Sequence, residues 1–229
     1  MEKNSDMSAH EIFPFPGKEL ALVELSYDLC YDKIPQADRE RAVCAAWDKG
    51  EQAARRIFAM VGDAEGSAEN NAKGNAEGNA EGNAEGNAEG NAGFRELLAK
   101  KGIACKEIDK DMIVGNRRYF CDYVSGRKEV VLYLPSIRLW AQENSLSMNV
   151  AVELILSHEF FHVLECTELG LTSKDYTVPI LRIGKLKLGR TGIRALSEIG
   201  AHAFARTYHD LKQSMHERAE REQDEKSHI

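Results

Sequence analysis

One segment, from Ser147 to about Glu168, limits the folds open to this chain more than any other. Its apolar residues surround the helix they would form, because they fall at positions 150, 152, 154, 155, 160, 161, 163 and 164. A helix that is apolar nearly all round must be buried. Ser147 is a suitable N-cap and Gly170 follows the last turn, so the sequence predicts a long buried helix with other elements packed around it.

The same helix carries His158-Glu159-Phe160-Phe161-His162, which has the pattern H-E-x-x-H. Two histidines four residues apart share a helix face, with about 5–6 Å between their Cβ atoms, so both imidazoles can reach one metal ion. Glu159 is rotated by about 100° from that face and stands beside the ion, where a carboxylate can take a proton from an activated water. The alternative is a pair of core histidines with an incidental glutamate, but a buried turn with three such groups requires partners for all of them.

A catalytic zinc site needs a third protein ligand. Glu198 is the preferred candidate, because it lies in a predicted helix from Ile193 to Leu211 whose Gly and Ala residues allow close approach to another helix. His202 follows four residues later on the same face. Either His202 assists a Glu198 ligand, or His202 is the ligand with Glu198 behind it. We favour one zinc ion held by His158, His162 and Glu198, with His202 in an ancillary catalytic role.

Other groups near this site also have two interpretations. Glu165, three residues after the second histidine, either orients that imidazole or is a solvated carboxylate at the helix end. Cys166 is rotated about 80° from the ligand face and is expected to be a small buried hydrophobic residue. The candidates for an oxyanion donor are His202, Tyr176 and Arg194, although the last two are more typical of ordinary loop and helix positions.

The rest of the chain predicts an α+β fold. Helices are expected from about Gln36, ending at Gly50 or continuing through it to Met60, at Phe94–Lys101 and from Pro135 to about Asn144. Strands are expected at Ile103–Ile108, Met112–Val114, Tyr119–Val124 and Glu129–Leu134. Residues 20–31 fit a strand or a helix equally well. The strands would form a small antiparallel or mixed sheet, packed on the H-E-x-x-H helix and on the second ligand-bearing helix.

Residues 64–91 are seven consecutive tetrads, the last four of which read AEGN. Gly and Asn are poor formers of regular structure and no side chain larger than Ala is apolar here, so we expect a flexible surface loop that folding does not require. Six glutamates and one lysine in this segment account for −5 of the net charge of −7. We expect one domain, residues 18–212, between a flexible N-terminus (1–17) and a charged C-terminal tail (213–229).

Charge and cysteine usage exclude several classes of protein. Outside the tetrads the chain is nearly neutral, which argues against a broad nucleic-acid surface and leaves only a local basic patch at 182–190. Five scattered cysteines without a C-x-x-C pair favour reduced thiols and a cytoplasmic location. The N-terminus lacks the basic start and apolar run of a signal peptide, and no stretch reaches the roughly 18 apolar residues of a membrane span. Neither secretion nor membrane insertion is expected.

The two motifs together resemble a known family. The sequence HEFFH at 158–162, followed by SEIGAHAFA at 197–205, is similar to zincin metallopeptidases with a glutamate as third ligand, and most similar to the ImmA/IrrE-type branch. Members of that branch carry a later helix of the approximate form E-x-x-A-x-x-F-A. Glu198, Ala201, Phe204 and Ala205 match that form.

This resemblance covers about residues 36–211 and departs from the family at two places. Phe161 stands where members usually have glycine, and the tetrads add 28 residues before the sheet. The resemblance implies a zincin-like fold and a zinc-dependent endopeptidase in which Glu159 is the general base. The implied substrate is a cytosolic protein or peptide, for which a transcriptional regulator is one candidate, although no helix-turn-helix module accompanies the domain here.

Two other functions remain open. The first is a non-catalytic metal-binding or protein-interaction domain that keeps the same fold. The second is a structural protein whose function lies in the tetrads. Metal content distinguishes the second from the other readings, and the effect of Glu159→Gln on proteolysis distinguishes the enzyme from the non-catalytic domain.

Overall fold

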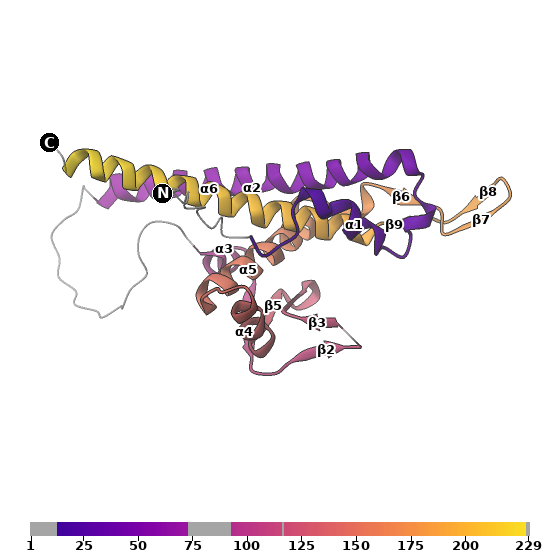
Figure 1. Cartoon of the computed structure of the whole chain (residues 1–229), viewed down its shortest axis with the longest axis horizontal. Coiled ribbons are helices and arrows are strands. Elements are labelled where there is room, and N and C mark those ends of the chain that lie inside the picture. The colour runs from indigo at the N-terminus through magenta and orange to yellow at the C-terminus, as the bar shows by residue number, and fades with distance from the viewer. Residues whose placement is uncertain (1–12, 73–92, 116, 228–229) are drawn as a thin grey trace, which may run out of the picture.

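The computed structural model describes residues 13–72, 93–115 and 117–227, and these form an α+β fold (Figure 1). The α-helices are α1 (Ala21–Ser26), α2 (Gln36–Ala72), α3 (Phe94–Lys100), α4 (Leu134–Glu143), α5 (Met148–Leu164) and α6 (Arg194–Ser227). Shorter helical turns are η1 (Lys18–Leu20), η2 (Tyr31–Lys33), η3 (Ser125–Arg127), the π-helical η4 (Glu165–Leu169) and η5 (Thr172–Lys174). The strands are β1 (Ala104–Ile108), β2 (Met112–Val114), β3 (Arg117–Tyr119), β4 (Cys121–Val124), β5 (Glu129–Tyr133), β6 (Thr177–Val178), β7 (Leu181–Ile183), β8 (Leu186–Leu188) and β9 (Thr191–Gly192).

The largest sheet has three strands in the order β1-β5-β4. β1 runs parallel to β5, with Ala104 opposite Glu129, whereas β4 runs antiparallel to β5, with Cys121 opposite Leu132. The sheet is therefore mixed. The predicted strand Tyr119–Val124 is divided in two, because β3 pairs with β2 as a separate hairpin and β4 pairs with β5.

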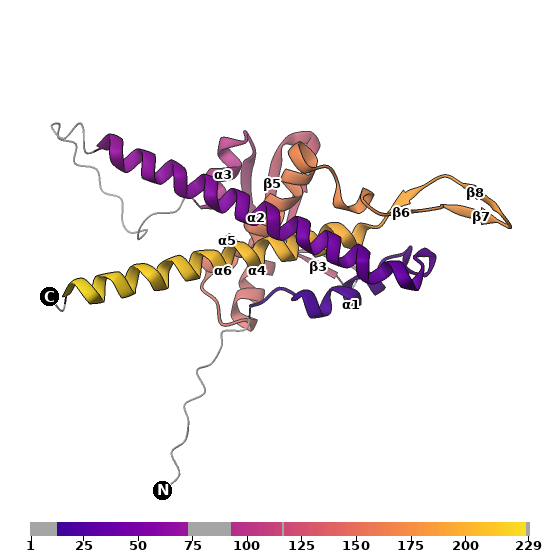
Figure 2. The same cartoon turned by 90° about the horizontal axis from the view of Figure 1, so that it is seen from above.

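The two longest helices, α2 and α6, pack against each other and run in the same general direction, crossing at an angle that Figure 2 shows. The sheet with α3, α4 and α5 lies to one side of them in Figure 1. The backbones of α2 and α6 come into close contact at glycine: a Cβ atom on Gly50 would lie only 2.1 Å from the carbonyl oxygen of Gly200. The small residues of α6 thus allow a close helix contact of the kind that the sequence predicted. Gly50 lies inside α2, so the first helix continues through it.

Helix α5 is buried, as its apolar residues predicted. It begins after Ser147, whose hydroxyl accepts a hydrogen bond from the backbone N–H of Val150 at 3.3 Å, which confirms the expected N-cap. The rings of Phe160 and Phe161 are at most 1 % exposed and pack against Phe204 of α6. These contacts fix α5 against α6 and so determine where the two histidines lie.

Both long helices extend past the ends expected from the sequence. Helix α2 continues to Ala72, so the tetrad residues 64–72 have helical backbone rather than the expected loop, while 73–91 lie outside the described residues. Helix α6 likewise runs past the expected helix end at Leu211 and includes residues 213–227 of the charged C-terminal tail. The physical reason is that adding a turn to an existing helix costs far less than nucleating one, and Ala, Glu and Arg are good helix formers.

Residues 13–17, at the end of the segment expected to be a flexible N-terminus, contact the rest of the protein. Within residues 13–17, Gly17 is buried and the ring of Phe15 stacks on Trp140 with 5.5 Å between ring centroids. The polar composition of the first residues gave no indication of these apolar contacts.

Residues 20–31, for which the sequence fitted a strand or a helix equally well, form helical structure: they include α1 and end where η2 begins.

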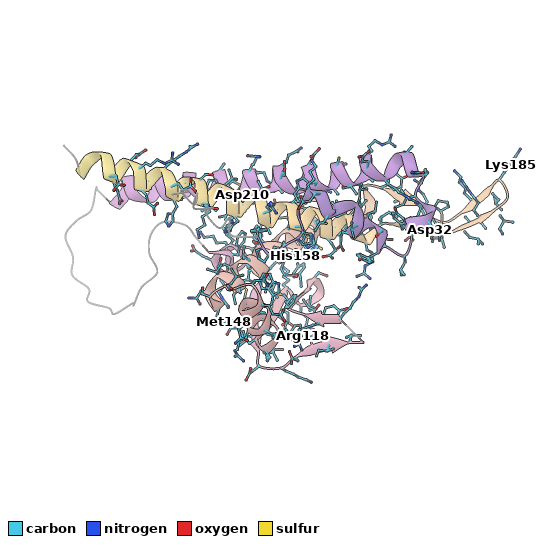
Figure 3. All side chains as sticks on the ribbon, viewed as in Figure 1. Asp32, Arg118, Met148, His158, Lys185 and Asp210 are labelled. Carbon is cyan, nitrogen blue, oxygen red and sulfur yellow. The ribbon has the colours of Figure 1, made fainter. Side chains whose placement is uncertain are left out.

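The segment between η5 and α6 contains four short strands that the sequence did not predict. β6 pairs with β9, and β7 pairs with β8 in a hairpin that projects from the body (Figure 1), with Lys185 at its tip (Figure 3). The basic residues at 182–190 therefore lie on this hairpin and just after it.

No helix within the described ranges has the length and apolar character needed to cross a membrane.

Candidate metal centre

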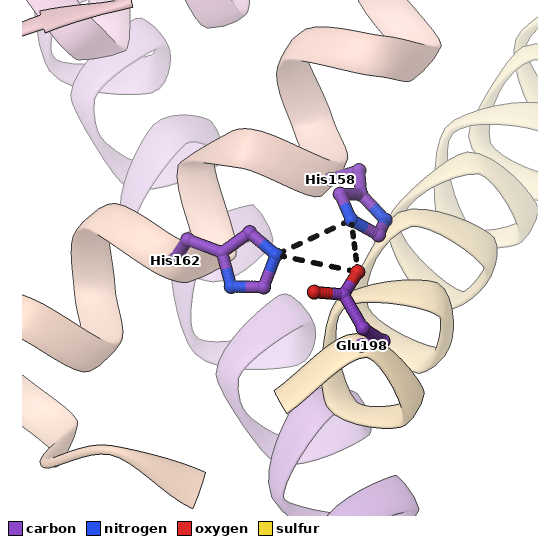
Figure 4. A group of neighbouring side chains, drawn as sticks. All are labelled: His158, His162 and Glu198. Atoms are coloured by element: carbon purple, nitrogen blue, oxygen red, sulfur yellow. Dashed lines mark hydrogen bonds and ion pairs between the residues drawn. The ribbon is translucent and has the colours of Figure 1, made fainter. Parts of the chain in front are cut away.

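Three of the predicted site residues come together where α5 meets α6 (Figure 4). His158 and His162 extend from α5 and Glu198 extends from α6, and one ligand atom from each lies within 4.8 Å of the others. The two Nε2 atoms are 3.3 Å apart, and Glu198 Oε2 lies 3.3 Å from Nε2 of His158 and 3.8 Å from Nε2 of His162. Two imidazole nitrogens and one carboxylate oxygen thus converge on one point.

Helix packing holds these three side chains in place. A Cβ atom on Gly200 would lie 2.8 Å from the ring of Phe161, so glycine at 200 allows the phenylalanine ring to lie directly against α6. This contact accounts for Phe161, the residue at which the sequence departs from the ImmA/IrrE pattern. At the start of α6, the carboxylate of Asp28 accepts a hydrogen bond from the backbone N–H of Ala195 at 3.0 Å and thereby caps the helix that carries Glu198.

Glu165 orients the second histidine. Its side chain is 2 % exposed, and its Oε2 accepts a hydrogen bond from Nδ1 of His162 at 2.9 Å. Its Oε1 accepts hydrogen bonds from the backbone N–H of Thr172 at 2.7 Å and the hydroxyl of Ser197 at 2.9 Å. When the His162 imidazole is neutral and Nδ1 is the donor, the lone pair lies on Nε2, which faces the cluster. The orienting role is therefore the one that the geometry favours for Glu165.

The charges of the cluster are strongly coupled. Burial acts to lower the pKa of His162, but hydrogen bonds to Glu165 and Glu198 outweigh it and hold that pKa well above its usual value. Burial acts to raise the pKa of Glu198, but the two histidines outweigh it and hold that pKa well below its usual value. In the protein without metal, the Glu198 carboxylate is therefore ionised and stabilises positive charge on the imidazole of His162. A divalent cation would take the place of that positive charge.

Glu159 lies beside the cluster, in a cleft of about 360 Å³ that is also lined by His158, Glu198 and His202. Burial raises the pKa of its carboxyl, while the neighbouring histidines act to lower it. A carboxyl group with a raised pKa is suited to accept and release a proton near neutral pH. The cleft therefore combines a possible base with the three converging ligand atoms.

His202 lies in the cleft but not in the ligand cluster. Its ring is 5.1 Å from the ring of His158, measured between centroids, and burial together with the charge of His158 lowers its pKa to about 3. A neutral imidazole at this position can donate one hydrogen bond. Tyr176 is not part of the cleft lining, since its hydroxyl donates to Asp38 at 2.7 Å, and Arg194 does not line the cleft either.

Several residues near the site were missed by sequence reasoning. Cys166 is exposed and not buried as expected, because the π-helical turn η4 buries Glu165 and leaves the next side chain outside. Phe15 and Trp140 line the cleft, as do Arg118 and Tyr119 from β3. The alternation of phenylalanine and proline in the otherwise polar N-terminus was the one signal that could have indicated Phe15.

Comparison with known proteins identifies no relative of this chain. The chain has no significant match among protein-family models, curated proteins or solved structures. Functional inference therefore rests on the arrangement of these side chains and on the motif.

Proposed function

We propose that the chain is a zinc-dependent endopeptidase with a zincin-like fold, of the ImmA/IrrE type, that hydrolyses peptide bonds in a cytosolic protein or peptide. The observation that carries the proposal is the convergence of His158, His162 and Glu198 within 4.8 Å, with Glu159 lining the same cleft. If His158 and His162 were only core histidines and Glu159 were incidental, the carboxylate of Glu198 would not be needed beside them on a second helix.

The donor set fits zinc. Zinc binds imidazole nitrogen and carboxylate oxygen at about 2.0–2.2 Å, and a tetrahedral arrangement at such distances separates neighbouring ligand atoms by about 3.3–3.6 Å. The three separations in the cluster are 3.3, 3.3 and 3.8 Å. Three protein ligands and an adjoining cleft are also the composition of catalytic zinc sites, which keep a position for water or substrate.

In this proposal each residue has a separate task. Bound zinc would polarise the scissile carbonyl and a water molecule. The carboxylate of Glu159 takes a proton from the attacking water as its oxygen bonds to the carbonyl carbon, and then gives the proton to the nitrogen as the C–N bond breaks. His202, neutral at physiological pH because of its low pKa, is the nearest candidate to donate a hydrogen bond to the carbonyl oxygen as negative charge develops there.

The test combines metal analysis with a substitution that removes the base. Purified protein should contain about one zinc per chain by mass spectrometry, and His158→Ala or His162→Ala should lose it. Glu159→Gln should keep the metal and the thermal midpoint but lower hydrolysis of a peptide library about 10²–10⁴-fold, because an amide cannot accept the proton. Glu143→Gln, at an exposed position on α4, is the matched control and should change nothing.

The outcomes separate the proposal from its alternatives. Zinc retained in both histidine variants would refute the metal site. Zinc bound through the three residues, but no hydrolysis that depends on Glu159, would leave a non-catalytic metal-binding domain.

A further inference from the structure

Residues 14–16 form one wall of the cleft at the candidate site. Pro14, Phe15 and Pro16 line that cleft together with Glu159 and Glu198. Part of a segment that the sequence assigns to a flexible end therefore borders the residues that would act on a peptide.

Phe15 is held by three rings. Its centroid is 5.5 Å from that of Trp140, 5.5 Å from that of His158 and 5.6 Å from that of His202, with interplanar angles of 30°, 35° and 26°. Stacked and tilted rings at such separations are a favourable aromatic geometry. The space between Trp140 and the two histidines is thus shaped for a flat aromatic side chain.

A second contact lies further along α6. The ring of Phe13 is 5.1 Å from the ring of His209, and the guanidinium group of Arg206 is 5.5 Å from its centre. Phe13 and Phe15 therefore occupy successive positions along the cleft and the adjoining face of α6.

Side chains alone hold this segment. In the part of the chain that the structure describes, no backbone hydrogen bond joins residues 13–16 to the rest of the protein. Pro14 and Pro16 have no N–H to donate, and proline preorganises an extended segment, which lowers the entropy lost on binding. Such a segment can leave the cleft without breaking a strand or a helix.

We propose that the space between Trp140, His158 and His202 at the cleft recognises an aromatic side chain next to proline in an extended peptide. Phe15, flanked by Pro14 and Pro16, occupies that space as a built-in competitor of such peptides. This inference rests on the proposed function, since it names the class of peptide that the enzyme would bind and the segment that limits access. A short tether gives an effective concentration of about 1 mM, so a segment with a Kd of about 0.1 mM would be bound about 90 % of the time and would weaken a competing peptide about tenfold.

The experiment measures peptide binding rather than activity. A fluorescein-labelled peptide with the sequence of residues 11–19, EIFPFPGKE, is titrated by anisotropy into the full-length Glu159→Gln chain, which cannot consume it, with and without zinc. Adding Phe15→Ala should strengthen binding about tenfold. Tyr27→Ala, which removes an aromatic ring that is 70 % exposed, is the control and should leave the affinity unchanged.

A second reporter comes from the chain itself. Trp140 stacks on Phe15, whereas the other tryptophan, Trp47, belongs to a separate core cluster. Peptide binding should therefore change tryptophan emission in the Phe15→Ala protein, and Trp140→Phe should abolish the change. If circular dichroism shows that Phe15→Ala is unfolded, Phe15→Leu takes its place, with an expected gain in affinity of two- to threefold.

Two results would overturn the inference. One is equal peptide affinity with and without the Phe15 substitution, and the other is equal binding of the twin peptide EIAPAPGKE. Neither result depends on catalysis. If the peptide binds as expected but no zinc is held and nothing is hydrolysed, the recognition pocket stands and the proposed peptidase function fails.

Discussion

The contact between α2 and α6 can be tested with two glycines of the same helix. A Cβ atom on Gly50 would lie 2.1 Å from the carbonyl oxygen of Gly200 and 2.8 Å from Cβ of Ala203, whereas a Cβ atom on Gly62 would meet no heavy atom within 4 Å. Gly62→Ala should therefore raise the free energy of unfolding by about 1 kcal/mol, because alanine has the higher helix propensity. Gly50→Ala has the same gain but must separate the two helix backbones by about 1 Å to reach an ordinary carbon–oxygen distance of about 3.3 Å.

The cost of that separation decides whether Gly50→Ala raises or lowers the free energy of unfolding. Overpacking a tight contact costs about 1–3 kcal/mol, and a helix carbonyl cannot rotate away, so the upper end applies and the net loss is about 2 kcal/mol. For a chain of this size 1 kcal/mol shifts the thermal midpoint by about 2–4 °C. Calorimetry on metal-free protein should thus show Gly50→Ala about 4–8 °C lower and Gly62→Ala about 2–4 °C higher. A rise of the same size in both variants would refute the close helix contact.

Three further predictions concern the site. Glu198→Ala should abolish stoichiometric zinc in a competition assay with a chromogenic chelator, while His202→Ala should weaken zinc at most 10- to 100-fold; the reverse order would make His202 the ligand. Glu165→Gln should weaken zinc about 10-fold, because the amide no longer holds the His162 tautomer with a full negative charge, and unchanged affinity in the same assay would contradict that role. Asp28→Ala, which removes the cap of α6, should lower the free energy of unfolding by about 1 kcal/mol in urea titration, and no loss would show that solvent caps the helix equally well.

The helix with the two histidines could be predicted because local signals agree there. Ser147 is a suitable N-cap, Gly170 a suitable stop, and the apolar residues on every side of the helix require burial whatever surrounds it. The place of Glu198 beside the two histidines could be predicted because the small residues of α6 indicate close packing against another helix. A side chain on the packed face of such a helix must meet a neighbour. The α+β class followed from the order of helices and strands.

The remaining features depend on contacts between distant residues. β1 pairs in parallel with β5, although 20 residues separate Ile108 from Glu129, and no local pattern specifies such a partner. The strands β6 to β9 have two or three residues each, too few for an alternation to be recognised. Phe15 depends on a pocket made by α4, α5 and α6, so its own neighbours in the sequence do not reveal that it is packed.

The pairing of α2 with α6 has a consequence for synthesis of the chain. The last residue of α2 and the first residue of α6 are 122 positions apart, so at about 5–20 residues per second α2 leaves the ribosome roughly 6–24 s before its partner begins to appear. Throughout that interval Trp47 and Ile57, which are buried in the finished protein, have no α6 to cover them. The nascent chain therefore exposes an apolar helix face that a chaperone can bind, and Glu198 reaches the two histidines only when that face is finally covered.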